Sequence, residues 1–411
     1  MLMIESDLAR LALYLHIPFC SSKCGYCDFN AYEGLDHLVP EYTPAILSEI
    51  ELWGTAATKH EVHTIFFGGG TPSLTDISDI EAIIAAVKNN YRLTDDVEWS
   101  LEANPTELTL GHLQDLRKAG INRLSMGVQS LQTDELKLLD RDHTPERVFE
   151  AFADARSAGF KNINLDLMFG LPDQKLETWQ DTVKKTLSME PEHLSCYALT
   201  VEPGTALYYQ VQKGLIVEPD PDIAADQYEW TQEELGKHGY SHYEISNWAK
   251  PDKECLHNLV YWRAQPYLGM GAGAHSFFAG QRFANIEAPN RYIDAIGATK
   301  LQRMEEGKST MQQIAAGETP DRDVILADAM ILGLRLLNGV NEINFEMEYG
   351  VKPSELYAES IQKHVNLGLL IRDGNWIKLT RNGLLLSNEV FIDLLPAENE
   401  TLVTLQEQLL A

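Results

Sequence analysis

Basic residues are scarce in this chain. Its 411 residues include 33 Lys and Arg against 61 Asp and Glu, which gives a formal net charge of −28. A surface with that balance repels phosphate backbones, so nucleic acid is excluded as a general partner. The same charge favours solubility and suits the attraction of a cationic partner protein.

Long apolar stretches are missing as well. No segment reaches the roughly 18 uncharged apolar residues that a membrane-spanning helix needs. Residues 1–20 carry acidic side chains early and have no basic segment ahead of an apolar one, unlike a secretory signal. We therefore expect a cytoplasmic protein. Its length and its 44% hydrophobic content suit one domain of about 250–300 residues and one smaller domain.

Cysteine is also rare. There are five cysteines, an odd number, and three of them lie within eight residues. In a large chain this usage indicates metal binding in a reducing compartment and argues against a disulfide framework. Cys196 and Cys255 stand alone, and we expect both to be small buried apolar residues.

The first two-thirds of the chain alternate apolar segments with amphipathic ones. We expect strands over residues 11–19, 62–67, 97–102, 122–126, 162–168 and 193–197. We expect helices over residues 39–57, 77–91, 110–119, 145–158 and 176–189. Such alternation predicts an α/β fold with a parallel sheet, and six units predict a partial (β/α)6 barrel within residues 1–297.

The remainder of the chain predicts a smaller domain. Residues 298–318 are polar and poor in aromatics, so we expect a linker there. Residues 319–411 contain helical patterns at 323–337 and 355–367, then a hairpin at 369–379 that turns at Asp373-Gly374-Asn375. Helices followed by a hairpin are typical of a winged helix. Because the chain is acidic, we expect this domain to pack on the barrel and not to bind DNA.

The three clustered cysteines are Cys20, Cys24 and Cys27, in a CxxxCxxC spacing. Thiolates suit either an iron–sulfur cluster or zinc. Three thiolates leave one corner of a four-iron cluster open for a substrate. The alternative is a zinc site completed by His16 or Asp28.

Polar residues follow several of the expected strands. The cysteine loop comes directly after the first strand, and active sites of barrels lie at the carboxyl ends of their strands. The later candidates at this edge are Gly68–Thr71, Glu102, Gln129 and Asp166. We therefore expect one site there, where glycines let the backbone approach a ligand closely.

Several motifs together resemble the radical S-adenosylmethionine (SAM) superfamily, in the branch of oxygen-independent coproporphyrinogen III oxidase. They are YLHIPFCSSKCGYC, FFGGGTPS, LEANP, RLSMGVQS, LDLMFGLP and YEISNWA. The resemblance implies a 4Fe–4S cluster on the three cysteines and a SAM molecule cleaved to a 5′-deoxyadenosyl radical. It also implies an electron donor for the cluster.

The same resemblance implies the residues around these cofactors. Without it, Arg141 would be interpreted as a surface residue of a helix. The implied positions are Tyr14, His16, Tyr26, Gly69, Gly70, Thr71, Glu102, Gln129, Arg141, Asp166 and Ala198.

Two departures from the oxidase separate this chain from that enzyme. Phe29 occupies the place of a further cysteine, and Cys20 comes too early for a long N-terminal arm. Both features, with HNLVYW and GMGAGAHS, are similar to the HemW haem chaperones. That resemblance implies haem binding and delivery to haem proteins, with membrane-associated respiratory proteins among the candidate acceptors. The alternative is oxygen-independent decarboxylation of coproporphyrinogen III.

Two histidines are candidates for contact with these ligands. Imidazole is a common ligand of haem iron. We expect His257 to contribute to a haem pocket, beside Tyr261 and Trp262, although a buried core histidine is the alternative. We expect His275, in a glycine-rich segment, to line the SAM end of the site.

Overall fold

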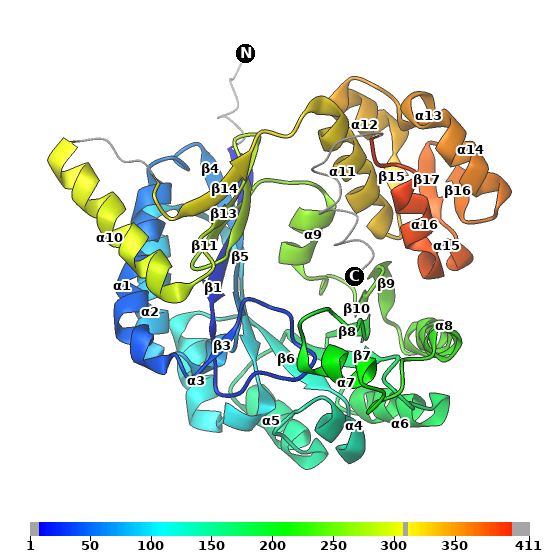
Figure 1. Cartoon of the computed structure of the whole chain (residues 1–411), viewed down its shortest axis with the longest axis horizontal. Coiled ribbons are helices and arrows are strands. Elements are labelled where there is room, and N and C mark those ends of the chain that lie inside the picture. The colour runs from blue at the N-terminus through cyan, green and yellow to red at the C-terminus, as the bar shows by residue number, and fades with distance from the viewer. Residues whose placement is uncertain (1–7, 307–310, 397–411) are drawn as a thin grey trace.

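The computed structural model describes residues 8–306 and 311–396 and has an α/β fold. Twelve strands form one sheet in the order β14-β13-β12-β11-β1-β4-β5-β6-β7-β8-β10-β9. Its centre is parallel, from β11 to β8. These strands are β11 (Tyr267–Met270), β1 (Ala9–Ile17), β4 (His60–Gly69), β5 (Arg92–Ala103), β6 (Arg123–Gln129), β7 (Ile163–Phe169) and β8 (His193–Ala198). The six expected strands are confirmed, and the sheet curves without closing (Figure 1).

Helices run along the outside of the curved sheet (Figure 1). They are α1 (Val39–Gly54), α2 (Ile77–Asn90), α3 (Leu110–Ala119), α5 (Pro145–Ser157) and α6 (Leu176–Leu187), and each was expected. Shorter or later helices were not expected, namely α4 (Thr133–Leu138), α7 (Ala206–Gln212), α8 (Pro221–Lys237) and α9 (Leu256–Trp262). No helix in the described ranges is long and apolar enough to cross a membrane.

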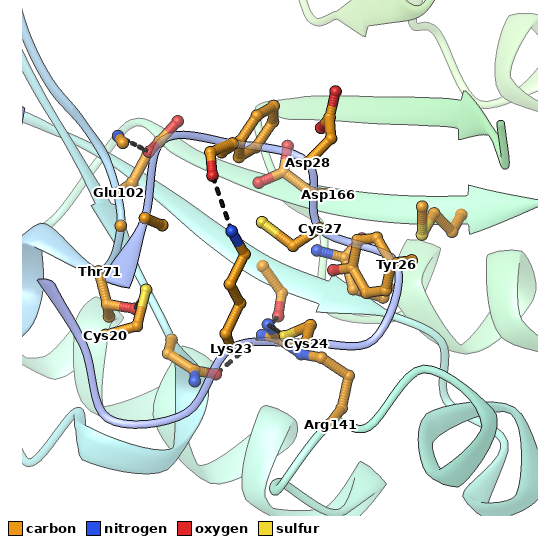
Figure 2. Close-up of a pocket in the computed structure, with 18 of the residues that line it drawn as sticks. Cys20, Lys23, Cys24, Tyr26, Cys27, Asp28, Thr71, Glu102, Arg141 and Asp166 are labelled. Carbon is orange, nitrogen blue, oxygen red and sulfur yellow. Dashed lines mark hydrogen bonds between the residues drawn. The ribbon is translucent and has the colours of Figure 1, made fainter. Parts of the chain in front are cut away.

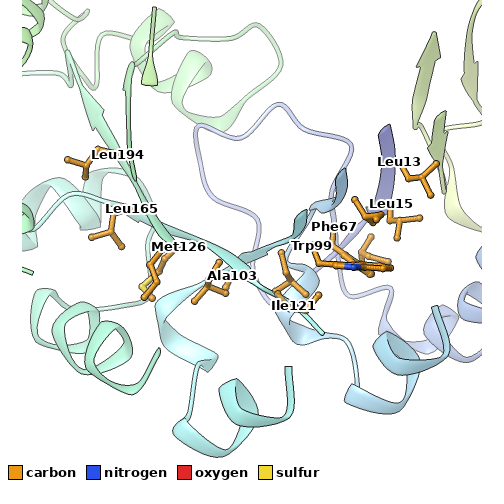
Figure 3. Close-up of a cluster of buried hydrophobic side chains, with 14 of the residues drawn as sticks. Leu13, Leu15, Phe67, Trp99, Ala103, Ile121, Met126, Leu165 and Leu194 are labelled. Carbon is orange, nitrogen blue, oxygen red and sulfur yellow. The ribbon is translucent and has the colours of Figure 1, made fainter. Parts of the chain in front are cut away.

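The main core lies between the parallel strands and these outer helices. Figure 3 shows apolar side chains along this layer, from Leu13 on β1 to Leu194 on β8. Leu13, Phe67 and Leu165 are fully buried, and Trp99 is 3% exposed. Each such side chain stabilises the fold by roughly 1.5–3 kcal/mol relative to an exposed one. The opposite, concave face is therefore left for polar chemistry.

Antiparallel strands extend both ends of the parallel sheet. On one side are β12 (His275–Phe278), β13 (Gln281–Asn285) and β14 (Ile314–Glu318), and on the other are β10 (Asn247–Ala249) and β9 (Ser241–Glu244). Two short strands, β2 (Phe19–Cys20) and β3 (Tyr32–Glu33), pair beside the start and end of the cysteine loop.

The expectation of a linker over residues 298–318 was wrong where the structure describes them. Helix α10 runs over Pro289–Glu306, and β14 pairs with β13. The polar sequence has two causes. Thr299 is a polar member of the buried stripe that begins with Tyr292 and Ile296, and β14 is an almost fully exposed edge strand.

The C-terminal part contains the expected helices and hairpin. Its elements are α11 (Arg322–Arg335), β15 (Val340–Asn341), α12 (Glu342–Tyr349), α13 (Pro353–Leu356), α14 (Ala358–Asn366), β16 (Leu370–Asp373), β17 (Trp376–Leu379), α15 (Arg381–Leu385) and α16 (Ser387–Ile392). Gly374 makes the hairpin turn with φ of 59°. Residues 397–411 of the expected domain lie outside the described residues.

This part packs on the barrel beside α9 (Figure 1). The Arg335 guanidinium lies 4.4 Å from the centre of the Trp262 ring. The Leu337 amide donates to the Tyr243 carbonyl, and Arg381 forms an ion pair with Glu233 at 2.9 Å. These contacts place the C-terminal part against the last third of the barrel.

Candidate functional site

The cysteine loop crosses the carboxyl ends of the parallel strands. Cys20 is buried, while Cys24 and Cys27 are half-buried. All three line one cavity of about 350 Å³. Figure 2 shows the sulfur atoms spaced around this cavity. Within the described residues, no three His, Cys, Asp or Glu side chains are grouped closely enough to hold a single metal ion.

The glycine run holds this loop in place. The Gly70 amide donates to the Ile17 carbonyl, and the Thr71 amide to the Phe19 carbonyl, both across 2.8 Å. A Cβ atom on Gly70 would lie 2.5 Å from the Phe19 carbonyl oxygen. Gly69 adopts φ of 114° and packs against the ring of His16. The glycines are thus required by the packing of the β4 loop on the cysteine loop.

Arg141 lies in the cavity, in the loop between α4 and α5, and not on a helix surface. Its Nη1 donates to Cys24 Sγ across 3.3 Å. Its Nη2 donates to Asn104 Oδ1 at 2.9 Å and to the Gly127 carbonyl at 2.6 Å. The buried Nε has no protein partner. Of the five guanidinium N–H groups, the Nε–H and the second Nη1–H have no protein partner among the described residues, so the side chain keeps donors for a bound carboxylate.

Two half-buried carboxyl groups face the same cavity. Glu102 Oε2 accepts a hydrogen bond from the Gly69 amide at 3.1 Å. Burial, together with repulsion from Asp166, raises the pKa of Glu102 to about 8. Burial also raises the pKa of Asp166, which accepts hydrogen bonds from Asn164 and Ser125. A positively charged ligand would favour the ionised form of both carboxyls. The two carboxylates therefore fit the ammonium and sulfonium groups of SAM.

Most of the other expected positions line this cavity too, namely Tyr26, Gly69, Gly70, Thr71, Gln129 and Ala198. The sequence did not point to several further lining residues, namely Asn104, Met168, Tyr197, Thr200 and Glu202. Most of these lie at or just after the ends of expected strands. The rule that identified Glu102 would therefore have found them.

A second cavity of about 400 Å³ adjoins the first. It contains Tyr14, His16 and His275, and it shares Phe29, Gly69 and Glu102 with the cluster cavity. The remaining lining residues are Asn30, Tyr261, Tyr267 and Gly273. The structure thus divides the expected positions between two neighbouring cavities.

His16 is fixed inside this second cavity. Its Nδ1 lies 3.1 Å from the Tyr14 hydroxyl and its Nε2 2.9 Å from the Asn30 carbonyl. Burial lowers the pKa of His16, so its ring is neutral at pH 7. His16 therefore orders the wall of the cavity and has no free ring nitrogen.

His257 lies in the interior of the barrel, 1% exposed. Its ring stacks on Phe66, with centroids 5.1 Å apart, and its Nε2 lies 2.8 Å from the Tyr261 hydroxyl. Its Nδ1 lies 3.5 Å from the Thr64 hydroxyl. Burial lowers the pKa of His257 to about 3. The structure thus gives His257 the surroundings of a core histidine, and it places Trp262 against Arg335 instead of beside a cavity.

The two isolated cysteines are 1% exposed, as expected of small apolar residues. Near Cys255 lies a buried guanidinium that the sequence did not point to. Arg123 is 2% exposed, and its charge acts on both Cys255 and Glu98. Arg123 begins an apolar strand, and that position alone does not predict that its charge is paired.

Comparisons with known proteins agree with this geometry. Residues 14–186 match the radical SAM superfamily, and residues 321–386 match the HemN C-terminal domain. Heme chaperone HemW of Bacillus subtilis is 36% identical over 379 residues, which cover 92% of this chain and 97% of that protein. Radical S-adenosyl methionine domain-containing protein 1, mitochondrial, of Mus musculus is 34% identical over 96% of this chain and 90% of that protein.

A solved structure has the same fold. Coproporphyrinogen III oxidase (HemN) of Escherichia coli, a radical SAM enzyme, superposes with a TM-score of 0.79. It is 26% identical and covers 94% of this chain, which in turn covers 90% of that structure. The chain therefore belongs to the radical SAM superfamily and, within it, to the HemW family.

Proposed function

We propose that this chain binds haem and passes it to haem proteins, and that it does so with a 4Fe–4S cluster and SAM in place. The observation that carries the proposal is the similarity along nearly the whole chain to heme chaperones, at 36% identity in Bacillus subtilis and 34% in Lactococcus lactis. Membership of the radical SAM superfamily implies the cluster and SAM. The proposed cargo is therefore haem, and the proposed resident cofactors are the cluster and SAM.

The donor set around the first cavity supports these cofactors. Cys20, Cys24 and Cys27 would hold three irons of the cluster. The free Nε of Arg141 and the Glu102 carboxyl would bind the charged groups of SAM. When bound, the pair supplies one-electron chemistry. The chain's own part is to supply the three thiolates and to balance the charges of the bound cofactors.

An electron donor and a haem acceptor are the proposed protein partners. The net charge of −28 would attract a cationic surface on either of them. We place the activity in the cytoplasm, because the cysteine usage suits a reducing compartment. Membrane-associated respiratory proteins are the acceptors we propose to test first.

The test is an anaerobic titration of the reconstituted chain with haem, followed by mixing with an apo haem protein. We expect one haem per chain and transfer of the Soret absorbance to the acceptor. Absence of stoichiometric binding, or binding without transfer, would overturn the proposal.

The second candidate is the oxidase reaction, which the HemN likeness favours. Phe29 argues against it: a phenylalanine, 64% exposed, occupies the position of the oxidase's further cysteine. We therefore expect no protoporphyrinogen IX from coproporphyrinogen III with SAM and a reductant. Formation of that product over multiple turnovers would show that the oxidase reaction is the better assignment.

A further inference from the structure

The second cavity has the walls of a site for a flat aromatic ligand. Phe29, Tyr14, Tyr261 and Tyr267 contribute four rings to it. Phe29 lines the cavity and is 64% exposed, so its ring is accessible to a ligand. Tyr261 meets Tyr267 edge to face, with ring centroids 4.7 Å apart, so the two rings pack together as one wall. A volume of about 400 Å³ lies within the range of about 300–1,000 Å³ typical of ligand pockets.

Two histidines line this cavity, and they differ in the availability of their nitrogens. Both ring nitrogens of His16 are engaged, as described above. His275, at the first position of β12, is exposed. Within the part of the chain that the structure describes, no hydrogen bond to the His275 ring is found. An iron ligand must offer a nitrogen lone pair, and His275 can do so without breaking an existing contact.

Other groups near the cavity are poorer iron ligands. The ring nitrogens of His257 face Tyr261 and Thr64 inside the barrel. Burial raises the pKa of the Tyr261 hydroxyl well above 10, which disfavours the tyrosinate that would bind iron. Glu102 already accepts the Gly69 amide and faces both cavities.

We propose that haem binds in the second cavity with His275, and not His257, as the ligand of its iron. This inference rests on the proposed function, because it locates the haem that the chain is proposed to carry. Phe29 and Tyr267 lie against the porphyrin faces. Tyr261 closes the far wall, and the hydrogen bond between its hydroxyl and His257 Nε2 holds the ring in place. His257 thereby becomes a positioning residue for Tyr261.

The placement also links haem to the cluster. Phe29, Gly69 and Glu102 line both cavities, so haem and SAM share a wall. Haem in this position lies beside the cofactors, not on a separate domain. Phe29 then has a physical role at the position where the oxidase has a cysteine. Its apolar ring covers part of the porphyrin, which a thiol would not do.

The experiment compares haem titrations of the reconstituted wild-type chain with those of His275→Ala, His257→Gln and Tyr261→Phe. His238→Ala is the matched control, because His238 is an exposed histidine at the end of α8. We expect His275→Ala to shift the Soret band and to weaken haem binding about tenfold or more. We expect millimolar imidazole to restore the wild-type spectrum of His275→Ala, which only a folded site can show.

The outcomes separate this inference from the proposed function. If the wild type and His275→Ala bind one haem with the same spectrum and affinity, the inference is overturned while haem binding stands. The inference is also overturned if the Soret band shifts in Tyr261→Phe or His257→Gln but not in His275→Ala. If the wild type itself takes up no stoichiometric haem, both proposals fail.

Discussion

Arg141 donates a hydrogen bond from Nη1 to the Sγ atom of Cys24, across 3.3 Å. The contact joins a residue expected to bind SAM to a residue expected to bind iron. A guanidinium N–H beside a metal-binding sulfur can give it a charge-assisted hydrogen bond. The same guanidinium keeps a buried Nε without a protein partner. Arg141 is thus placed to act on both cofactors.

The first prediction concerns Arg141→Ala. We expect SAM affinity to fall at least tenfold, since losing a buried charge-assisted pair costs on the order of 2–5 kcal/mol. We expect the cluster to assemble but with a changed reduction potential, because the cation beside Cys24 is gone. Calorimetry measures the first effect and a redox titration the second. Arg92→Ala, at the opposite end of β5 from Glu102, should change neither; unaltered SAM affinity in Arg141→Ala would contradict the assignment.

The second prediction concerns the cysteines. Alanine at Cys20, Cys24 or Cys27 should abolish the four-iron signal. Among the described residues, the cluster cavity contains only these three cysteines, so no other thiolate can replace a lost one. Alanine at Cys196 or Cys255 should leave the signal intact, because both are buried away from the cluster cavity. Iron and sulfide content with EPR of the reduced protein measures this. A full four-iron signal in Cys24→Ala would refute the cluster assignment.

The third prediction is a pH dependence that Glu102 imposes on the cofactor-free chain. Burial raises the pKa of Glu102 to about 8, against about 4.3 in the unfolded chain. Between these values the folded state holds a proton that the unfolded state lacks. Stability therefore falls as pH rises from about 4.5 to about 8.

Glu102→Gln should remove that contribution. We expect the variant to have a higher Tm than wild type at pH 8, by on the order of 2 °C or more, and a smaller difference at pH 5. Thermal unfolding of the cofactor-free protein at the two pH values measures it, with the exposed Glu51→Gln as the matched control. An identical pH dependence in wild type and Glu102→Gln would show that Glu102 ionises normally in the folded chain.

The fourth prediction compares two glycines. A Cβ at Gly70 would meet the backbone of Phe19 at 2.5 Å, whereas a Cβ at Gly111, on α3, meets nothing within 4 Å. We expect Gly70→Ala to destabilise the fold by about 1–3 kcal/mol and to reduce cluster occupancy. We expect Gly111→Ala to be neutral or to stabilise by up to about 1 kcal/mol. Denaturant unfolding and iron content measure the pair, and equal stabilities would show that the cysteine loop adapts.

Much of the fold could be predicted because local signals and burial agree. The helix over residues 110–119 was expected with both ends correct, since Thr109 caps its start and Gly120 ends it with φ of 126°. The parallel strands are apolar runs buried on the helix side, as in Leu124 and Leu165. Such patterns need no knowledge of distant contacts.

Other parts depended on contacts that are remote in sequence. Strand β11 is four residues long and joins the parallel sheet only because β1 leaves an open edge. The buried stripe of α10 includes Thr299, whose polarity hid the pattern. Tyr14 and His275 are far apart in the chain, and no local sequence pattern predicts that they line one cavity.

The candidate site shows the same division. The cysteine spacing and the residues at strand ends indicated the cluster cavity, because parallel strands bring their carboxyl ends together. His257 was harder, because an aromatic neighbourhood suits a ligand pocket and a core equally. The burial of His257 favours the core interpretation, and burial is a property of the folded chain that no local pattern gives.

The pairing of β1 with β11 has a consequence for the order in which the molecule matures. Tyr14 lies opposite Gly269 in the sheet, so one side of β1 has no partner until residue 270 has been synthesised. Until then the strand that leads into the cysteine loop presents unpaired amides and carbonyls, which are prone to pair with other chains. In a truncated or nascent chain, iron would therefore have to bind a cysteine loop whose supporting strand, β1, is still unpaired on one side. Iron insertion should follow completion of the barrel, and N-terminal fragments that stop before β11 should aggregate instead of accumulating as cluster-bearing intermediates.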